Sequence, residues 1–468
     1  MLFFFNNEAM NDYERIPYSS FCWKFGTTSF RTKEFNRMTE WQLKLLDEFW
    51  QKPEYSWQGW ETAAPGQNGI YEIKTKYYDW LVEKKFMEGG ENFNGKFKTA
   101  RNKTSGLYDM GFIDNEHRLT EVGETLLEIS QSGNFNNKNE LGISGDSETY
   151  LKQLLKVSNK YGETYVRPFI IALYLLDRLD FLSNEEFSYL MPLCMDSSST
   201  AKVIQCITNL RNNVGSVDKY ILEVILDKDN YKKGLERFVN NDFSENLLLS
   251  VSMNRKSAKY DKAYVPLFYN AHTVYMEGDD SKIVDLLNCL SKFQSSISIK
   301  WKHLFFKVHQ KAKIKKNPRL YLRTIPQEAM TSEKEFKKFF YITMHLFKAK
   351  ATLEDYLDLN RRYLNLSNCF LFEDNQVKLD IVPKHFFHSA MSELYKQAFS
   401  KSKLLYKNCS MTNICPSLTF KEKDVIKGIN KQIGTQIATI EEAYNKVNQI
   451  RYDRFSKLVD SKFTDNKL

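Results

Sequence analysis

The sequence lacks the features that mark secreted and membrane-spanning proteins. No apolar run approaches the roughly 20 residues that a membrane-spanning helix requires. The apolar N-terminus, residues 1–5, ends at Asn6-Asn7-Glu8 and has no basic region before it, unlike a signal peptide. These absences predict a cytoplasmic protein that does not contact a membrane.

Cysteine is sparse and is not arranged for metal binding. The chain has seven cysteines, and no two of them form a C-x-x-C pair. The closest two, Cys409 and Cys415, have a spacing that fits no common zinc site. His385 and His388 could face one ion on a helix, but no further ligand lies at a supporting distance in the sequence. We therefore expect free thiols in a reducing compartment and no metal site.

Motifs of several enzyme classes are also missing. There is no G-x-S-x-G nucleophile elbow and no G-x-x-x-x-G-K-[ST] phosphate loop. A magnesium-dependent nuclease needs clustered carboxylates, often with a Glu-x-Lys pattern on a strand. The pattern occurs at residues 72–74 and 83–85, but both stretches have helical periodicity and no acidic strand precedes them. The sequence therefore predicts no catalytic residue and no cofactor in this chain.

What the sequence does contain is typical of a globular, mainly α-helical protein. Hydrophobic residues make up 42% and charged residues 27% of 468 residues, which fits two or three folded domains. The formal net charge is +9 at neutral pH, and such a basic excess suits a polyanionic partner. Most segments show apolar residues at helical spacing.

The first segment, 1–135, predicts a winged-helix-like DNA-binding module with a short β wing. A basic helix at residues 96–108 precedes the stretch 110–123, whose pattern indicates a short strand, a polar turn, a second strand and a helix capped by Thr120. Residues 25–31 add hydroxyl groups and an arginine, which are good phosphate ligands. The alternatives are a solvated charged face for the helix and a structural strand edge for residues 25–31. The candidate DNA contacts are Thr27, Thr28, Ser29, Arg31, Lys98, Arg101, Asn102 and Lys103.

The second segment, 150–385, follows a polar linker and is mostly helical. Its residues 300–323 include nine lysines and arginines, while neighbouring aromatic residues are expected to fix one face to the core. Near its end, residues 370–372 and 377–379 flank a polar turn and repeat the pattern of a wing. The third segment, 386–468, is expected to be a helical linker or partner surface. The candidate contacts in the second segment are Lys311, Lys313, Lys315, Lys316, Arg319, Arg361 and Arg362.

Several of these motifs occur in the order found in a known family. The stretch 25–31, the wing at 110–123, the helix pair that begins at Tyr165, the hairpin at 370–382 and the helix around Arg454 resemble the AlwI-type restriction endonucleases. This family of type IIS enzymes also includes nicking enzymes. The resemblance spans nearly the whole chain and is carried by the order of the motifs.

The resemblance implies a winged-helix recognition region for double-stranded DNA, a helical linker and then a Mg²⁺-dependent nuclease domain. Family members typically continue well beyond the helix around Arg454, and Ser456 stands where the family tends to have an acidic residue. We therefore expect a recognition region or subunit without the nuclease domain. Mg²⁺ would belong to an associated nuclease domain or subunit, and a methyltransferase would complete the restriction-modification system.

Three other functions remain open at this stage. The chain could be a complete Mg²⁺-dependent endonuclease with an unrecognised active site, or a DNA-binding regulator without nuclease activity. A helical protein-binding scaffold is the third, and it predicts no salt-dependent affinity for DNA.

Overall fold

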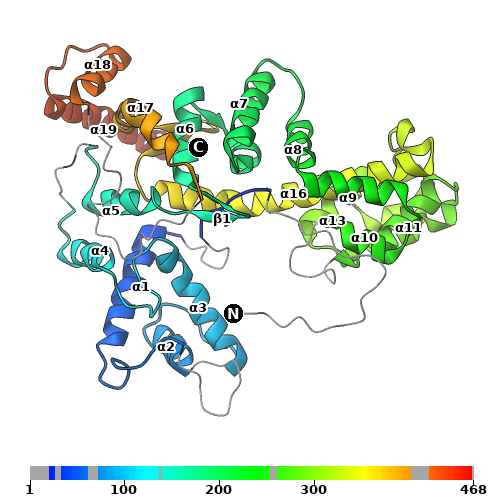
Figure 1. Cartoon of the computed structure of the whole chain (residues 1–468), viewed down its shortest axis with the longest axis horizontal. Coiled ribbons are helices and arrows are strands. Elements are labelled where there is room, and N and C mark those ends of the chain that lie inside the picture. The colour runs from blue at the N-terminus through cyan, green and yellow to red at the C-terminus, as the bar shows by residue number, and fades with distance from the viewer. Residues whose placement is uncertain are drawn as a thin grey trace. The chain divides into compact units, whose positions relative to one another are not determined.

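The fold is mainly α-helical, as the periodicity predicted. The computed structural model describes residues 21–26, 33–61, 72–135, 139, 141–252, 261–401 and 421–465 (Figure 1). Within these residues, the strands are short and form two three-stranded antiparallel sheets.

Backbone packing divides the chain into two compact units that are interlaced along the sequence. The body of unit 1 is Ser198–Asp355, whereas unit 2 combines Trp23–Ser197 with Tyr356–Leu468. The long helix α16 (Glu333–Asn365) begins in unit 1 and ends in unit 2. The three functional segments expected from the sequence remain a prediction, because compactness of the backbone does not test them.

The first part of unit 2 is built from α1 (Phe35–Trp50), α2 (Glu72–Glu83), α3 (Phe93–Asp109) and α4 (Glu121–Ser132). Helix α1 is amphipathic, and the side chains of Leu43, Leu46 and Phe49 on its apolar side are fully buried. Helices α2 and α3 pack closely against each other. Asn92 caps α3, because its side chain accepts a hydrogen bond from the Gly95 amide at 2.9 Å.

The predicted wing between α3 and α4 is present, reduced to a single antiparallel bridge between Ile113 and Leu119. Thr120 caps α4 as expected, accepting from the Gly123 amide at 3.3 Å and donating to the Gly111 carbonyl at 2.7 Å. A Cβ atom at Gly123 would overlap the Phe112 carbonyl oxygen, so glycine is required where α4 crosses the wing. These contacts fix the wing against the start of α4.

The second part of unit 2 begins with α5 (Gly145–Leu154) and a sheet of β1 (Asn159–Tyr161), β2 (Thr164–Val166) and β6 (Phe399–Ser400), in that spatial order. Helix α6 (Pro168–Leu179) starts with proline at its first position, where the missing amide proton is not needed. Arg167 is buried just before α6 and donates to the Gln397 carbonyl at 2.8 Å, which ties this helix to the end of α17 (Ile381–Lys396).

The other sheet of unit 2 has the strand order β3 (Leu182–Ser183), β5 (Gln376–Leu379), β4 (Phe370–Glu373). Strands β4 and β5 form the hairpin predicted from the sequence, and Asp374 and Asn375 at its turn both have positive φ, as a type I′ turn requires. The chain order is α6, β3, the helical turns η1 (Glu186–Leu190) and η2 (Met191–Leu193), the end of α16, and the hairpin. This is the connectivity of a winged helix whose second and third helices are separated in sequence by unit 1.

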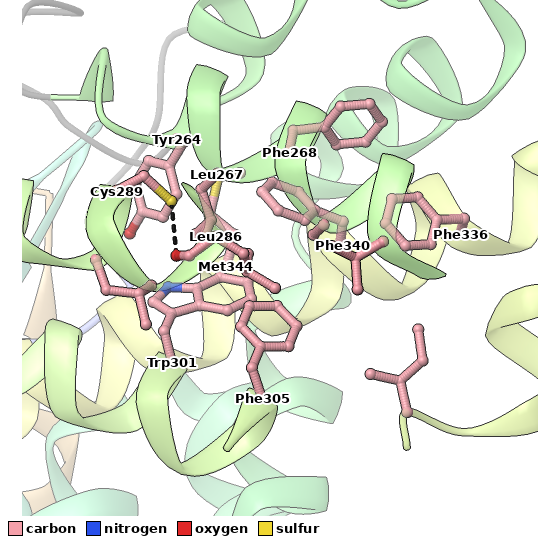
Figure 2. Packing of buried hydrophobic residues seen from close by; sticks show 14 of the residues in the cluster. Tyr264, Leu267, Phe268, Leu286, Cys289, Trp301, Phe305, Phe336, Phe340 and Met344 are labelled. Carbon is pink, nitrogen blue, oxygen red and sulfur yellow. Dashed lines mark hydrogen bonds between the residues drawn. The ribbon is translucent and has the colours of Figure 1, made fainter. Parts of the chain in front are cut away.

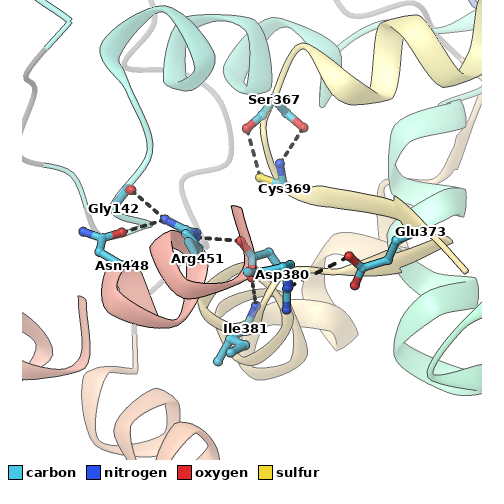
Figure 3. Close-up of polar contacts among 9 residues, drawn as sticks. Gly142, Ser367, Cys369, Glu373, Asp380, Ile381, Asn448 and Arg451 are labelled. Carbon is cyan, nitrogen blue, oxygen red and sulfur yellow. Dashed lines mark hydrogen bonds and ion pairs between the residues drawn. The ribbon is translucent and has the colours of Figure 1, made fainter. Parts of the chain in front are cut away.

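The C-terminal part of unit 2 packs α18 (Glu422–Ile433) and α19 (Ile440–Asp465) against the start of α17 through an apolar cluster. Gly434, with φ of 68°, ends α18 and separates it from α19 within the helical third segment that the sequence predicted. The buried Asp380 carboxylate caps α17 and accepts from Arg451 of α19 at 2.7 Å, while Arg451 also bonds Asn448 and the Gly142 carbonyl (Figure 3). One partly buried ion pair therefore connects α19 to the end of the β4–β5 hairpin.

Unit 1 is entirely helical apart from one β bridge in the residues that the structure describes. Trp301 and Phe305 of helix α13 (Ser295–Phe305) lie in the core of unit 1 beside Tyr264, Phe340 and Met344 (Figure 2). Trp301 contacts Phe305 and Phe340 at ring-centroid distances of 5.4 Å each. The helices before α16 are α7 (Ser197–Arg211), α8 (Val217–Leu226), α9 (Asp229–Asn240), α10 (Glu245–Val251), α11 (Tyr264–Tyr275), α12 (Ile283–Cys289), α13 (Ser295–Phe305), α14 (Lys311–Lys316) and α15 (Pro318–Tyr321).

Candidate nucleic-acid interface

Helix α3 presents the polar face that the sequence predicted, with Lys98 and Arg101 exposed to solvent. Neither side chain forms an ion pair with any residue that the structure describes. Ser105 and Tyr108 follow at helical spacing on the same side and are half-buried. We call these four residues the α3 face.

The wing extends the α3 face. The Tyr108 hydroxyl donates to the Asn115 side chain at the wing turn at 2.8 Å. His117 of the same turn stacks on Trp60 at 4.0 Å between ring centroids, and Glu116 accepts from the Trp60 amide at 3.0 Å. The turn is therefore held on both sides, and its amide-bearing Asn115 is exposed next to α3.

Lys74 of α2 contributes charge close to the α3 face. It is buried and forms an ion pair with Glu61 at 2.6 Å. Burial lowers the pKa of Lys74, Glu61 opposes that effect, and the nearby Arg101 adds to the lowering. Arg101 is therefore close enough to Lys74 for their like charges to interact.

Asn102 and Lys103 are less accessible than Lys98 and Arg101. Both are half-buried, and Lys103 lies over the ring of Phe86 with its amine 6.0 Å from the ring centroid. Burial lowers the pKa of Lys103. Their role as DNA contacts stays a prediction. Four further candidates, Thr27, Thr28, Ser29 and Arg31, lie outside the described residues.

A second cation-rich surface lies on unit 1, on α14 and α15. Lys311, Lys313, Lys315 and Lys316 of α14 are all exposed, while Ile314 between them is fully buried and fixes the helix to the core. The sequence holds no aspartate or glutamate from residue 286 to residue 327. Because this stretch of the sequence holds no acidic residue, positive charge is concentrated on this surface. We call the four lysines and Arg319 the basic surface.

The flanks of the basic surface are fixed by the backbone. Phe306 and Leu322 form an antiparallel bridge, and the Lys307 and Arg323 amides donate to the Tyr321 and Phe305 carbonyls at 2.9 and 2.8 Å. Of the four aromatic residues expected to fix this face to the core, Trp301, Phe305 and Phe306 are buried, whereas Tyr321 is half-buried. Arg319 pairs with Asp280 at 3.0 Å, and both side chains are more than half exposed, so this ion pair is weak.

The last two candidates, Arg361 and Arg362, lie on the final turns of α16 in unit 2. Arg361 is exposed and its guanidinium lies 5.1 Å from the ring centroid of Phe372 in the hairpin. Arg362 pairs with Asp358 at 2.8 Å and lines a small polar cavity with Asn36, Asn365 and Asn368. Arg361 therefore lies beside the β4–β5 wing. Arg362 instead faces a cavity that is lined in part by α1.

The described residues do not fit a Mg²⁺ site of the kind that the nuclease chemistry needs. No three aspartate, glutamate, histidine or cysteine side chains among them come close enough to hold a metal ion. The Glu-x-Lys pattern at 72–74 lies on helix α2, with Lys74 buried against Glu61. His385 and His388 turn to separate partners, Gln432 at 2.8 Å and Asp177 at 2.6 Å.

Two residues of the candidate interface at α3 and the wing were not among the contacts predicted from the sequence. Tyr108 and Asn115 join the α3 face to the wing, and the spacing of Arg101, Ser105 and Tyr108 could have identified the first of them. Asn115 has no such signal, because only the folded wing brings it to Tyr108.

The cysteines of the described residues form no disulfide, and all of them are buried. They are Cys22, Cys194, Cys206, Cys289 and Cys369.

Taken with the fold, these features define a mainly helical protein with cation-rich surfaces on two compact units. Residues 108–468 match the family model described as AlwI restriction endonuclease, and the chain belongs to this family. The matched range contains the wing, the basic surface and the β4–β5 hairpin, while Lys98 and Arg101 precede it. No curated protein matches the sequence. Family membership indicates a type II restriction enzyme, whose substrate is DNA. None of the described helices is long and apolar enough to cross a membrane.

Proposed function

We propose that the chain binds double-stranded DNA sequence-specifically, as the recognition region of a type IIS restriction endonuclease. The observation that carries this proposal is the α3 face, where Lys98 and Arg101 are exposed and unpaired among the described residues, next to a fixed wing. A helix that carries arginine and polar side chains can enter the major groove and read base edges. Asn115 and Tyr108 would add hydrogen-bonding groups at the edge of that helix.

The basic surface of unit 1 supports the same proposal in a different way. Exposed lysines neutralise phosphates and make affinity depend on salt, but they carry little sequence information. Arg361 beside the β4–β5 wing and Arg362, which follows it on α16, are further candidate contacts in unit 2. The partly buried Arg451–Asp380 pair would hold the C-terminal helices in place for a nuclease domain or subunit.

The test is a selection of random-sequence duplexes by the purified protein at several salt concentrations. The proposal predicts a short, asymmetric motif among the tightest binders, and an affinity that falls steeply as salt rises. Binding without a shared motif would contradict sequence recognition. No binding at low salt would reject DNA binding by this chain and favour a helical protein-binding scaffold.

A second candidate function is cleavage by this chain itself, and family membership favours it. Recognition alone and cleavage by this chain can be distinguished with plasmid DNA that carries the selected motif. The plasmid is incubated with the pure protein and Mg²⁺. Cleavage that requires Mg²⁺ and the motif would establish a complete endonuclease. Binding without cleavage would favour a recognition region that acts with a nuclease subunit, and a cognate methyltransferase would then be expected in the same system.

A further inference from the structure

Two histidines face each other at the edge of the basic surface. His303 lies in the last turn of α13, and His309 lies in the segment that leads to α14. Their ring centroids are 4.2 Å apart with the rings nearly perpendicular, and both side chains are exposed. Contact between two exposed imidazoles places two titratable groups where their charges interact strongly.

The charges that surround this pair are positive. The pKa of His303 is lowered, and the largest cause is its partial burial. The remaining causes are the neighbouring titratable and charged groups His309, Arg323, Lys300 and Lys302. Arg323 is exposed and its Nε donates to the Phe306 carbonyl at 3.0 Å, so its position beside the pair is fixed. Lys307 of the intervening segment donates to the Leu320 carbonyl at 3.1 Å.

The carboxylates of the neighbouring elements are occupied by other cations. Glu354 of α16 pairs with Lys300 at 2.6 Å. Asp280 pairs with Arg319, and Asp285 of α12 pairs with Lys282 at 3.2 Å. Within the described residues, no acidic side chain is recorded against either imidazole. A proton on the pair would therefore add to an unneutralised positive field unless an anion is bound.

We propose that His303 and His309, together with Arg323, form a binding site for a phosphate group of the DNA backbone, and that phosphate binding is coupled to protonation of the two histidines. This inference rests on the proposed function, because it assigns DNA phosphate as the ligand. The bound anion accepts hydrogen bonds from the imidazolium N–H groups and from the guanidinium. The protons come from solvent, so binding takes up protons.

The sign of the pH dependence follows from linkage. A bound phosphate stabilises the protonated form, so the pKa of the pair is higher in the complex than in the free protein. The gain in affinity is complete below the free-state pKa and is lost as pH rises through the pKa of the complex. Because the pKa of free His303 is below its ordinary value of 6.5, the gain develops on the acidic side of neutrality.

The first experiment measures DNA affinity at constant ionic strength between about pH 5.5 and about pH 8. The wild-type protein should bind about tenfold more tightly at the acidic end. The double variant His303→Gln/His309→Gln should bind as the wild type does near pH 8 and lose most of the acidic gain. The control is His385→Gln/His388→Gln, whose histidines hold Gln432 and Asp177 in unit 2, and it should keep the wild-type profile.

Retention of the acidic gain by His303→Gln/His309→Gln would overturn the proposal, as would a flat wild-type profile. A wild-type protein that binds no DNA at any pH would instead contradict the proposed function. In that case NMR titration of the histidine ring protons with inorganic phosphate still tests the site. The pKa of both His303 and His309 should rise in phosphate while that of His385 stays constant, and no rise would reject a phosphate site of any origin.

Discussion

The α3 face and the basic surface are both cation-bearing, but they differ in composition and in how their side chains are held. The α3 face has two exposed cations beside Tyr108, Ser105 and the amide of Asn115, and neither cation forms an ion pair with a described residue. The wing fixes this face by hydrogen bonds. The basic surface has four exposed lysines in six residues and no amide side chain between them. Hydrogen-bonding variety is needed to distinguish bases, whereas charge density is needed to bind phosphates.

The difference teaches that net charge alone does not locate a recognition element. Both surfaces contribute to the formal charge of +9, yet only the α3 face combines a long helix, a wing and side chains suited to base edges. We therefore expect changes in the α3 face to alter which DNA is bound. Changes in the basic surface should alter how tightly any DNA is bound.

The largest effect is expected from removing charge from the basic surface. Replacing Lys311, Lys313, Lys315 and Lys316 by glutamine should weaken binding to all duplexes about a hundredfold and reduce the salt slope by about three. Fluorescence anisotropy at several salt concentrations measures both. The control is Lys233→Gln/Lys334→Gln, which removes two exposed lysines of unit 1 outside this surface and should lower affinity by far less than half as much. A loss restricted to the selected motif would break the comparison.

The next effect concerns the stability of the unit that carries the α3 face. Burial and, to a lesser extent, Asp146 raise the pKa of Glu40 on α1 to about 7, although hydrogen bonds from Ser130 and Tyr150 partly oppose them. A raised carboxyl pKa contributes stability that is present below the unfolded-state value and is lost as pH rises through about 7. Glu40→Gln should therefore stabilise the protein by about 2 kcal/mol near pH 8 and little near pH 5.

Thermal unfolding of the wild type and of Glu40→Gln at the two pH values checks this prediction. Glu128, which is exposed on α4, offers the control Glu128→Gln, which should leave the pH dependence of unfolding unchanged. An equal stabilisation by Glu40→Gln at both pH values would show that Glu40 does not titrate near neutrality. The result separates a pH effect on the scaffold of the α3 face from the histidine effect at the basic surface.

A somewhat smaller effect is expected at Arg101. Arg101→Ala should cost about 1–2 kcal/mol for the selected motif, a loss of about tenfold, and much less for random DNA. Lys98→Ala is the comparison on the same face and should weaken both ligands to a similar extent if it contacts phosphate. Equal losses for motif and random DNA with Arg101→Ala would assign Arg101 to the phosphate backbone as well.

The smallest effect tests the support of the α3 face. Thr120→Ala removes the cap of α4 and the bond to the Gly111 carbonyl, and should cost about 1 kcal/mol of stability. Because the wing is attached at this point, binding to the selected motif should fall a few-fold while binding to random DNA is kept. Thr125→Ala, on the exposed side of the same helix, serves as control. A variant with full stability and full motif affinity would show that the cap does not position the wing.

The sequence determined the mainly α-helical class, the basic helix before the first wing, and the β4–β5 hairpin. These features depend on local patterns: helical spacing in α3, a capping threonine at Thr120, and a polar turn between β-branched and aromatic residues. The order of the motifs was also sufficient to indicate the family, which the match over residues 108–468 confirms.

Only the tertiary structure decided how distant segments combine. It joined β3 to β5 across nearly two hundred residues and bonded Arg167 to the Gln397 carbonyl across 230 residues. It also paired Arg451 with the buried Asp380. Such contacts depend on packing between elements that are remote in sequence, and no local periodicity specifies them. Local physical chemistry therefore fixed what each segment is, whereas long-range packing decided which side chains meet to form a surface.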